Sequence, residues 1–249
     1  MKRLLAAGTG SIYQICKVFR DGESGRRHNP EYTLLEWYRT GFDHAALMVD
    51  VESLLREVLR DIKPLAPARH RTYRDLFRDS AGIDPFATSV NEIRETLQAR
   101  GIDAPPGLGE DEIDGWLDLL LTHVIEPALD AGLDFVSEYP ASQAALARLL
   151  PGEPGTAARF EVYLDGVELA NGYHELTDAA EQRRRFERDN VHRGARHLAA
   201  VEPDRRLLAA LQAGLPDCAG VALGIDRLLM VAGGAGHINE VMAFPLELA

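Results

Sequence analysis

Charged side chains gather in the block FRDGESGRRHNPEYTLLEWY, residues 19–38. Arg20, Arg26, Arg27 and His28 surround a loop rich in glycine, asparagine and proline. An arginine guanidinium presents a planar fork of donors that holds phosphate oxygens through two hydrogen bonds. The block therefore predicts a phosphate-binding loop, and the alternative is a solvated, charged hairpin tip without a ligand.

The same block carries an acid and a phenol two residues apart. Glu36 and Tyr38 follow the loop in a run of strand-forming residues. Side chains two positions apart in a strand lie on one face of the sheet. A carboxylate beside a phenolic hydroxyl suits recognition of an ammonium group, so we expect Glu36 and Tyr38 to line a pocket for an amine.

A second block, ARFEVYLDGVELANGYHEL at 158–176, is an acidic hairpin. Its Asp-Gly pair at 165–166, between apolar flanks, is a strong signal for a two-residue turn. Regular pairing across this turn sets Glu161 opposite Ala170 and places Glu161 and Glu168 on one face. Two such carboxylates could hold Mg²⁺ against nucleotide phosphates, and the alternative is an ordinary acidic face in solvent.

Two further polar side chains of the hairpin have the opposite alternation. Asn171 and Glu175 are an even number of positions apart, whereas each is an odd number of positions from Glu168. In a regular strand they therefore share one face, and Glu168 points to the other. For all of them to face one site the strand must bulge or bend. We expect this at Gly172, because glycine within a strand often marks such a position.

The third block is GVALGIDRLLM, residues 220–230, in which a strand ends at Gly224 and a helix begins near Asp226. Gly220 and Gly224 would let a flat ligand approach the backbone. Arg227, in the first helical turn, could stack on a base or bind a phosphate. The block lacks the GxGxxG spacing and the βαβ unit of a Rossmann site. The alternative is a helix N-terminus that simply packs on a strand.

The elements that must position these blocks change character along the chain. Strand patterns are followed by a mainly helical middle and then by strands and helices again, which indicates an α+β fold with an antiparallel sheet flanked by helices. Ser89 is the expected N-cap of a helix at 89–100. Strands are expected at 11–20, 31–39, 158–176 and 218–224, and helices at 44–60, 177–196, 203–213 and after 226.

Composition limits the classes of partner. The 249 residues carry a formal net charge of −12, which argues against tRNA and favours a basic protein partner. No stretch has the roughly 18 continuous apolar residues of a membrane span, and the apolar run at the start is too short for export. Cys16 and Cys218 form no CxxC pair, which favours free thiols in a reducing cytoplasm.

Together the three blocks resemble class II aminoacyl-tRNA synthetases of the lysyl subgroup. Residues 19–38 resemble motif 2, 158–176 the acidic segment, and 218–230 motif 3. RRHNPEYTLLEWYR, SEYPASQAALARL and GLPDCAGVALGIDRL further resemble the paralogues that attach a lysine-type amino acid to elongation factor P and lack an anticodon-binding module. The resemblance implies a single class II catalytic domain over 1–249, with a helical insertion at about 61–150.

The resemblance also implies a role for each matching side chain. Arg20 and Arg227 would be catalytic and bind ATP, with His28, Asn29, Tyr32, Glu168, Leu169 and Gly224 completing the ATP site; Glu36, Tyr38, Asn171 and Glu175 would line the amino-acid pocket; Glu161 and Glu168 would bind Mg²⁺.

The implied chemistry has two steps. Lysine or β-lysine attacks the α-phosphate of ATP to form an adenylate, and the acyl group then passes to a lysine side chain of elongation factor P. Two alternatives stay open: a lysyl-tRNA synthetase-like enzyme that charges tRNA or stops at the adenylate, and a non-catalytic paralogue.

Two features depart from the family pattern. Gly22 stands where motif 2 often has a glutamate that contacts adenine, and Glu23 could take its place. The family also has motif 1, which forms its homodimer interface, upstream of the position that matches Met1. We therefore expect an N-terminally truncated form of the catalytic fold, and a homodimer for the full-length family member.

Overall fold

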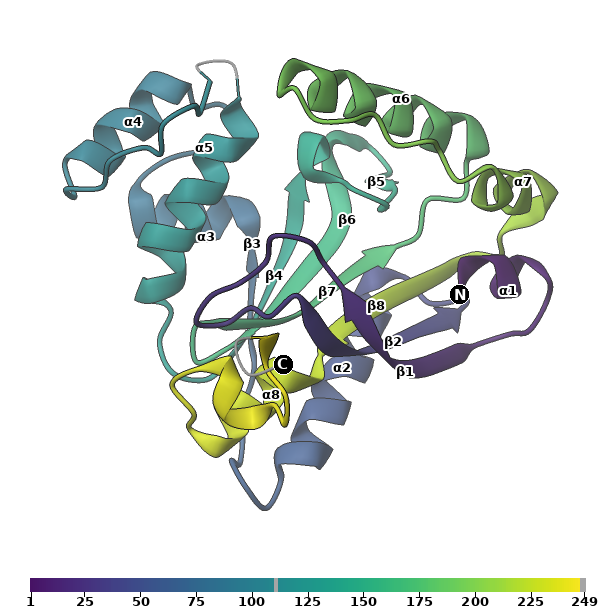
Figure 1. Cartoon of the computed structure of the whole chain (residues 1–249), viewed down its shortest axis with the longest axis horizontal. Helices are drawn as coiled ribbons and strands as arrows, with labels where there is room; N and C mark the ends of the chain where they lie inside the picture. Colours follow the sequence, from purple (N-terminus) through teal and green to yellow (C-terminus); the bar gives the residue numbers. More distant parts are fainter. Residues whose placement is uncertain (110–111, 247–249) are drawn as a thin grey trace.

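An eight-stranded, mostly antiparallel sheet forms the centre of the computed structural model, which describes residues 1–109 and 112–246 (Figure 1). The strands lie in the order β1-β2-β8-β7-β6-β4-β3, with β5 paired to β6, and among the described strands only β3 and β4 run parallel. Residues 110–111 and 247–249 of the predicted domain lie outside the described residues. The strands are β1 (Ile12–Phe19), β2 (Glu31–Thr40), β3 (Arg69–Thr72), β4 (Leu133–Pro140), β5 (Leu149–Leu150), β6 (Glu153–Leu164), β7 (Val167–His174) and β8 (Cys218–Gly224).

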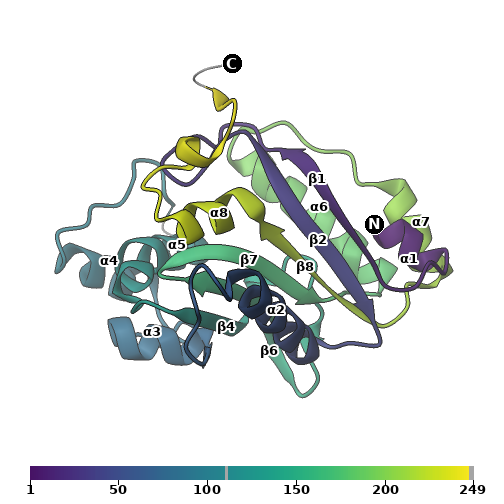
Figure 2. The same ribbon diagram turned by 90° about the horizontal axis from the view of Figure 1, so that it is seen from below.

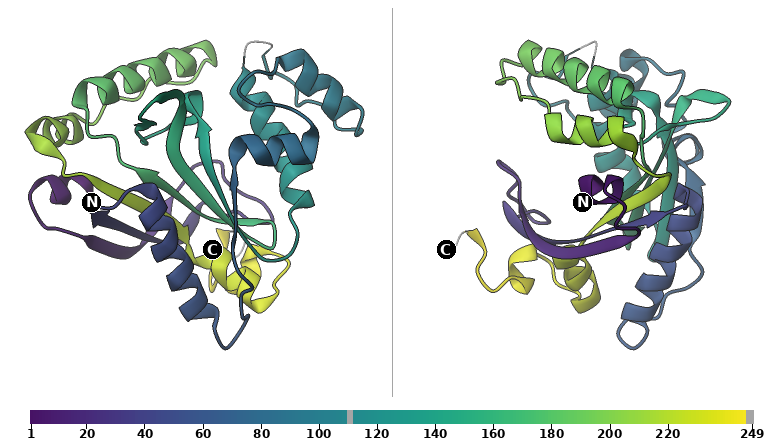
Figure 3. Two further views of the ribbon diagram at one scale, coloured as in Figure 1. Left: turned by 180° about the vertical axis from the view of Figure 1, so that it is seen from behind. Right: turned by 90° about the vertical axis from the view of Figure 1, so that its right-hand side faces the viewer.

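Helices lie on both sides of this sheet, which confirms the predicted α+β class. Helix α2 crosses β6, β7 and β8 (Figure 2). Helices α6 and α7 lie on the other side of the curved sheet (Figure 3), and α1 packs against α7. The α-helices are α1 (Lys2–Ala6), α2 (His44–Leu59), α3 (Tyr73–Ala81), α4 (Val90–Gln98), α5 (Ile113–Leu120), α6 (Ala179–Ala195), α7 (Arg205–Gly214) and α8 (Ile225–Gly233).

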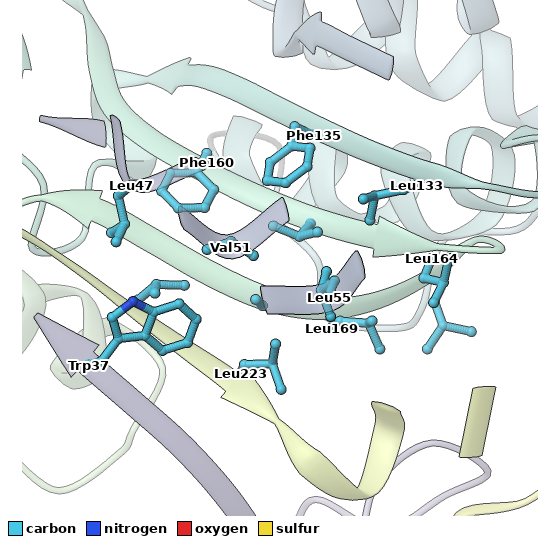
Figure 4. Close-up of a cluster of buried hydrophobic side chains, with 14 of the residues drawn as sticks. Trp37, Leu47, Val51, Leu55, Leu133, Phe135, Phe160, Leu164, Leu169 and Leu223 are labelled. Carbon is cyan, nitrogen blue, oxygen red and sulfur yellow. The ribbon is translucent and has the colours of Figure 1, made fainter. Parts of the chain in front are cut away.

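The face of the sheet under α2 is the apolar one. Leu47, Val51 and Leu55 recur every four residues and form a buried stripe on α2. This stripe packs against side chains that include Phe160 and Leu223, as Figure 4 shows. Because side chains alternate along a strand, the polar residues between these positions point to the opposite face. The candidate site residues therefore belong to the face away from α2.

Among its described residues, the stretch predicted as a helical insertion, about 61–150, contains three strands as well as helices, so the prediction is wrong in part. Helices α3, α4 and α5 do pack together around Tyr73, Phe77 and Trp116. However, β4 also lies in this stretch and pairs with β6 in the main sheet. Most of β4 is buried on both faces, so it lacks the alternation that identifies a half-exposed strand.

Helix α5 continues into a π-helical turn, Leu121–Ile125, and then a 3₁₀ turn, Glu126–Ala128. Two more 3₁₀ turns occur at Ala141–Gln143 and Ile238–Val241. Among the described residues, no helix combines the length and hydropathy that a membrane span requires.

Candidate active site

Strand pairing brings residues from all three sequence blocks into rows across the sheet. Glu36 of β2 lies opposite Ala222 of β8, which lies opposite Asn171 of β7, which lies opposite Glu161 of β6. Neighbouring strands are about 4.8 Å apart, so this row spans four adjacent strands. The hairpin, motif 2-like and motif 3-like blocks therefore share one surface.

A second row runs parallel to the first, two residues away along each strand. Tyr38, Gly220, Tyr173 and Arg159 are successive partners in it. Residues two apart share a face, so the two rows lie side by side on the face that α2 leaves open.

Strand β7 contains the bulge that this convergence requires. Glu161 pairs with Asn171, and the predicted pairing of Glu161 with Ala170 is wrong. The register shifts by one residue, which leaves Leu169 as an extra residue between Glu168 and Ala170. An extra residue reverses the alternation beyond it, so Asn171 and Glu168 come to lie on the same face.

The bulge is not at Gly172, where it was predicted. A Cβ atom built on Gly172 would lie 2.3 Å from Cζ of Phe160, which belongs to the apolar core. Gly172 therefore makes room for an aromatic ring on the α2 side.

A cavity of about 180 Å³ opens between the loop after β1, the bulged part of β7 and the start of α8. All residues assigned to ATP by resemblance line it: Arg20, His28, Asn29, Tyr32, Glu168, Leu169, Gly224 and Arg227. Asn171 and Ala222 of the first row also reach this cavity. It therefore adjoins the row that carries Glu36.

Arg227 joins the three blocks at this cavity. Its Nη1 donates to the backbone oxygen of Glu168 at 2.9 Å and to the Glu168 carboxylate at 3.2 Å. Its Nε donates to the backbone oxygen of Arg27 at 3.2 Å, and its Nη2 lies 2.6 Å from Nε2 of His28. Burial, followed by the Arg227 charge, lowers the pKa of His28, so a neutral imidazole is favoured beside this guanidinium.

Arg20 and Asn29, which also line the cavity, differ in how many contacts they already make within the protein. The Arg20 guanidinium lies 5.5 Å from the centre of the Tyr32 ring and 3.4 Å from the Glu23 carboxylate. Asn29 is buried, and its amide donates to the backbone of Glu31 at 2.6 Å and accepts from Leu246 at 3.1 Å. Arg20 is thus available to a ligand, whereas the Asn29 amide is already used to hold the loop.

The residues that the resemblance assigns to the amino-acid site form a cluster beside this cavity. The Tyr38 hydroxyl donates to the Glu36 carboxylate at 2.6 Å. Glu175 is 1% exposed, and Nζ of Lys2 lies 2.5 Å from its Oε2. A Cβ atom on Gly220 would lie 2.3 Å from the Tyr38 ring and 2.7 Å from Oε1 of Glu175. These two side chains therefore meet above Gly220, and together with Glu36 they form the carboxylate cluster at the predicted ammonium pocket.

Comparison with known proteins agrees with this arrangement. The family model of class II tRNA synthetases (D, K and N) matches residues 1–248. The chain belongs to this family. Curated relatives named elongation factor P–(R)-β-lysine ligase include one from Vibrio cholerae, 49% identical over this whole chain and 76% of the relative. Another, from Klebsiella pneumoniae strain 342, is 48% identical over this whole chain and 75% of the relative.

These findings confirm the resemblance drawn from the three blocks, and they confirm the class II synthetase fold. A third relative of the same name, from Salmonella gallinarum, is 47% identical over this whole chain and 75% of its own length. The family and names leave the roles of individual residues as predictions, which the site geometry supports to different degrees.

The predicted Mg²⁺ ligands of this synthetase-family site differ in their surroundings. Burial and the nearby Glu161 charge raise the pKa of Glu168 to about 7. A bound cation would offset the repulsion between these two carboxylates. Glu161 already accepts four hydrogen bonds, from Tyr139 and Tyr163 at one oxygen and from Arg159 and Asn171 at the other. Glu168 therefore fits a metal ligand directly, whereas Glu161 fits after exchange of one of these bonds.

Within the described residues, no group of three or more His, Cys, Asp or Glu could hold a metal ion. Mg²⁺ in nucleotide sites is usually held by one or two carboxylates together with substrate phosphates. The acid pair fits that pattern and does not fit an all-protein metal cage.

Sequence reasoning missed two acids of the synthetase-family site. Asp226 is buried at the start of α8, and its carboxylate accepts from the Thr33 backbone at 2.5 Å, which ties motif 3 to β2. Glu126 lines an adjoining cavity of about 760 Å³ together with Arg27 and Glu168. The position of Asp226 in the first turn of a predicted helix could have identified it. Glu126 had no such signal, because it reaches the site from the helical middle of the chain.

Proposed function

We propose that the chain is an ATP-dependent ligase that activates a lysine-type amino acid, (R)-β-lysine or lysine, as its adenylate and transfers it to a lysine side chain of elongation factor P. One observation carries the proposal: a cavity lined by guanidinium groups adjoins a cluster of carboxylates on the same sheet face. The names of relatives nearly half identical over the whole chain support the identity of both substrates.

In the activation step, the amino-acid carboxylate attacks the α-phosphate of ATP and pyrophosphate leaves. Arg20 is exposed at the cavity and would bind the phosphate on which negative charge builds up. Arg227 would hold the nucleotide while it fixes Glu168 and the loop at His28. Mg²⁺ held by Glu168 and Glu161 would supply positive charge to the phosphates.

The ammonium pocket would orient the amino acid. Glu175 and Glu36 supply negative charge, and the bond from the Tyr38 hydroxyl fixes the Glu36 carboxylate. Asn171 lines the nucleotide cavity and follows Glu36 and Ala222 in the same row, so it would lie near the reacting carboxylate. Positioning of two substrates in one orientation contributes much of the rate in such reactions.

We also propose that the acceptor is a protein and not tRNA, that the reaction takes place in the cytoplasm, and that the full-length family member is a homodimer. The net charge of −12 supports a basic protein acceptor over a polyanion.

Pyrophosphate release tests the proposal. With ATP and Mg²⁺, the protein should release pyrophosphate when lysine or (R)-β-lysine is added and not when norleucine, which lacks the side-chain ammonium, is added. Glu175→Gln should weaken amino-acid binding more than ATP binding. Pyrophosphate release that is independent of any lysine-type amino acid would refute the proposed substrate.

A further inference from the structure

Lys2 lies inside the ammonium pocket, next to a carboxylate that the proposed function assigns to the substrate. Its Nζ is 2.5 Å from Oε2 of Glu175, and the two side chains are 12% and 1% exposed. Lys2 begins α1, whose Leu5 packs with Tyr38 and Leu211 in a buried cluster. The ion pair is therefore held in a packed part of the molecule.

The charges around Glu175 leave one negative charge for a ligand. Glu36 and Glu175 contribute −2 and Lys2 contributes +1, which gives −1. Arg148 and Asp217 form their own pair at 2.6 Å and cancel. Two phenols and a thiol also face Glu175, and burial raises the pKa of each, so they stay neutral: Tyr38 of β2, Tyr173 of β7 and Cys218 of β8.

We propose that Lys2 is a specificity-determining residue of the ammonium pocket: its ammonium keeps the buried Glu175 carboxylate ionised, so that the pocket presents one net negative charge to the substrate's side-chain ammonium. The inference rests on the proposed function for the identity of that substrate. Burial raises the pKa of Glu175, and the Lys2 charge offsets part of that rise; a buried carboxylate without a counter-ion takes up a proton. Without Lys2, the substrate would meet a neutral carboxyl group at Glu175 and a weaker hydrogen bond.

The opposite effect is expected if Lys2 merely competes with the substrate for Glu175. Removal of a competitor would strengthen the binding of lysine relative to a neutral analogue. Removal of a counter-ion would weaken it, so the direction of the change decides between the two.

The test compares lysine with norleucine in ATP–pyrophosphate exchange. Lys2→Met should lower the ratio of kcat/KM for lysine over norleucine by about tenfold, the difference between a charge-assisted and a neutral hydrogen bond. Lys2→Arg should retain the ratio. Arg3→Met is the matched control, because Arg3 lies beside Lys2 on α1 but is exposed, and it should leave the ratio unchanged.

A double variant separates the charge from the packing of Lys2. In a Glu175→Gln background, Lys2→Met should lower the ratio no further. If Lys2→Met alone does not fold, the double variant should fold, because the uncompensated acid is gone. An unchanged or increased ratio in Lys2→Met, or a double variant that also fails to fold, would overturn the proposal.

A measurement without substrate keeps this inference separate from the proposed function. Carbon-13 NMR of labelled glutamate, with the signal assigned by Glu175→Gln, should show Glu175 ionised at pH 7 in the unaltered protein and protonated in Lys2→Met. Ionised Glu175 in both would overturn the role of Lys2, even if the protein activated no amino acid. Lack of lysine activation together with the expected NMR change would refute only the proposed function.

Discussion

A methyl group added at Gly220 would test how the ammonium pocket is built. In Gly220→Ala the new Cβ would lie 2.3 Å from Cε1 of Tyr38 and 2.7 Å from Oε1 of Glu175. Neither distance is tolerable, so the ring or the carboxylate must move. We expect the Tyr38 hydroxyl to lose its 2.6 Å bond to Glu36, because a shift of the ring moves the hydroxyl that it carries.

The size of the effect follows from these contacts. Overpacking costs about 1–3 kcal/mol of unfolding free energy, and a hydrogen bond to a charged group contributes about 1.5–3 kcal/mol. Loss of that bond should raise the amino-acid KM by about 10- to 100-fold. The ATP KM should change less than about twofold, because Gly220 does not line the nucleotide cavity.

Gly172→Ala is the matched control. Its new Cβ would also lie 2.3 Å from a ring, that of Phe160, but on the apolar face. We expect a similar loss of stability in urea denaturation without a change in the amino-acid KM. If pyrophosphate exchange gave the same amino-acid KM for both variants, the placement of Tyr38 and Glu175 above Gly220 would be wrong.

Three further outcomes follow from the described contacts. Arg227→Lys should lower the kcat/KM for ATP by about 100-fold, since one ammonium cannot replace four guanidinium contacts; a loss below threefold in pyrophosphate exchange would contradict its role. Burial raises the pKa of Glu126 to about 6. Its ionised form therefore destabilises the folded state once the pH rises above the pKa of this glutamate in the unfolded chain. Glu126→Gln should therefore add about 1 kcal/mol of stability in urea denaturation at pH 8, and this gain should vanish toward pH 4. Burial raises the pKa of Cys218 to about 12, so iodoacetamide at pH 8 should modify Cys16 and spare Cys218 in mass spectra until urea is added.

Local signals in the sequence predicted turns and helix starts correctly. Asp165 and Gly166 both have positive φ, at 51° and 71°, as a two-residue hairpin turn requires. Ser89 caps α4 through a bond from the Glu92 backbone, as predicted. These features depend on neighbouring residues, so a single sequence contains the information that specifies them.

Signals that depend on distant packing were misread. Gly172 indicated a bulge, but it is a glycine because the Phe160 ring packs over it. The bulge occurs at Leu169, where no glycine marks it. A glycine in a strand is consistent with either a bulge or a close approach, and only the tertiary structure distinguishes them.

The sequence predicted which residues form the candidate site, but it did not predict which of them pair with other residues of the protein. The three blocks supplied Arg20, Glu168 and Arg227, and the structure gathers them at one cavity. The pairing of Lys2 with Glu175 had no sequence signal, because 173 positions separate the two and no periodicity connects them. Ion pairs of this kind arise from sheet order and helix packing, which a single sequence does not specify.

Mass spectrometry of the acceptor tests the central claim most directly. The protein would be incubated with ATP, Mg²⁺, labelled (R)-β-lysine, purified elongation factor P and total tRNA. We predict that one labelled β-lysyl group appears on a lysine of elongation factor P and none on tRNA. Label found on tRNA, with elongation factor P unmodified, would contradict the account.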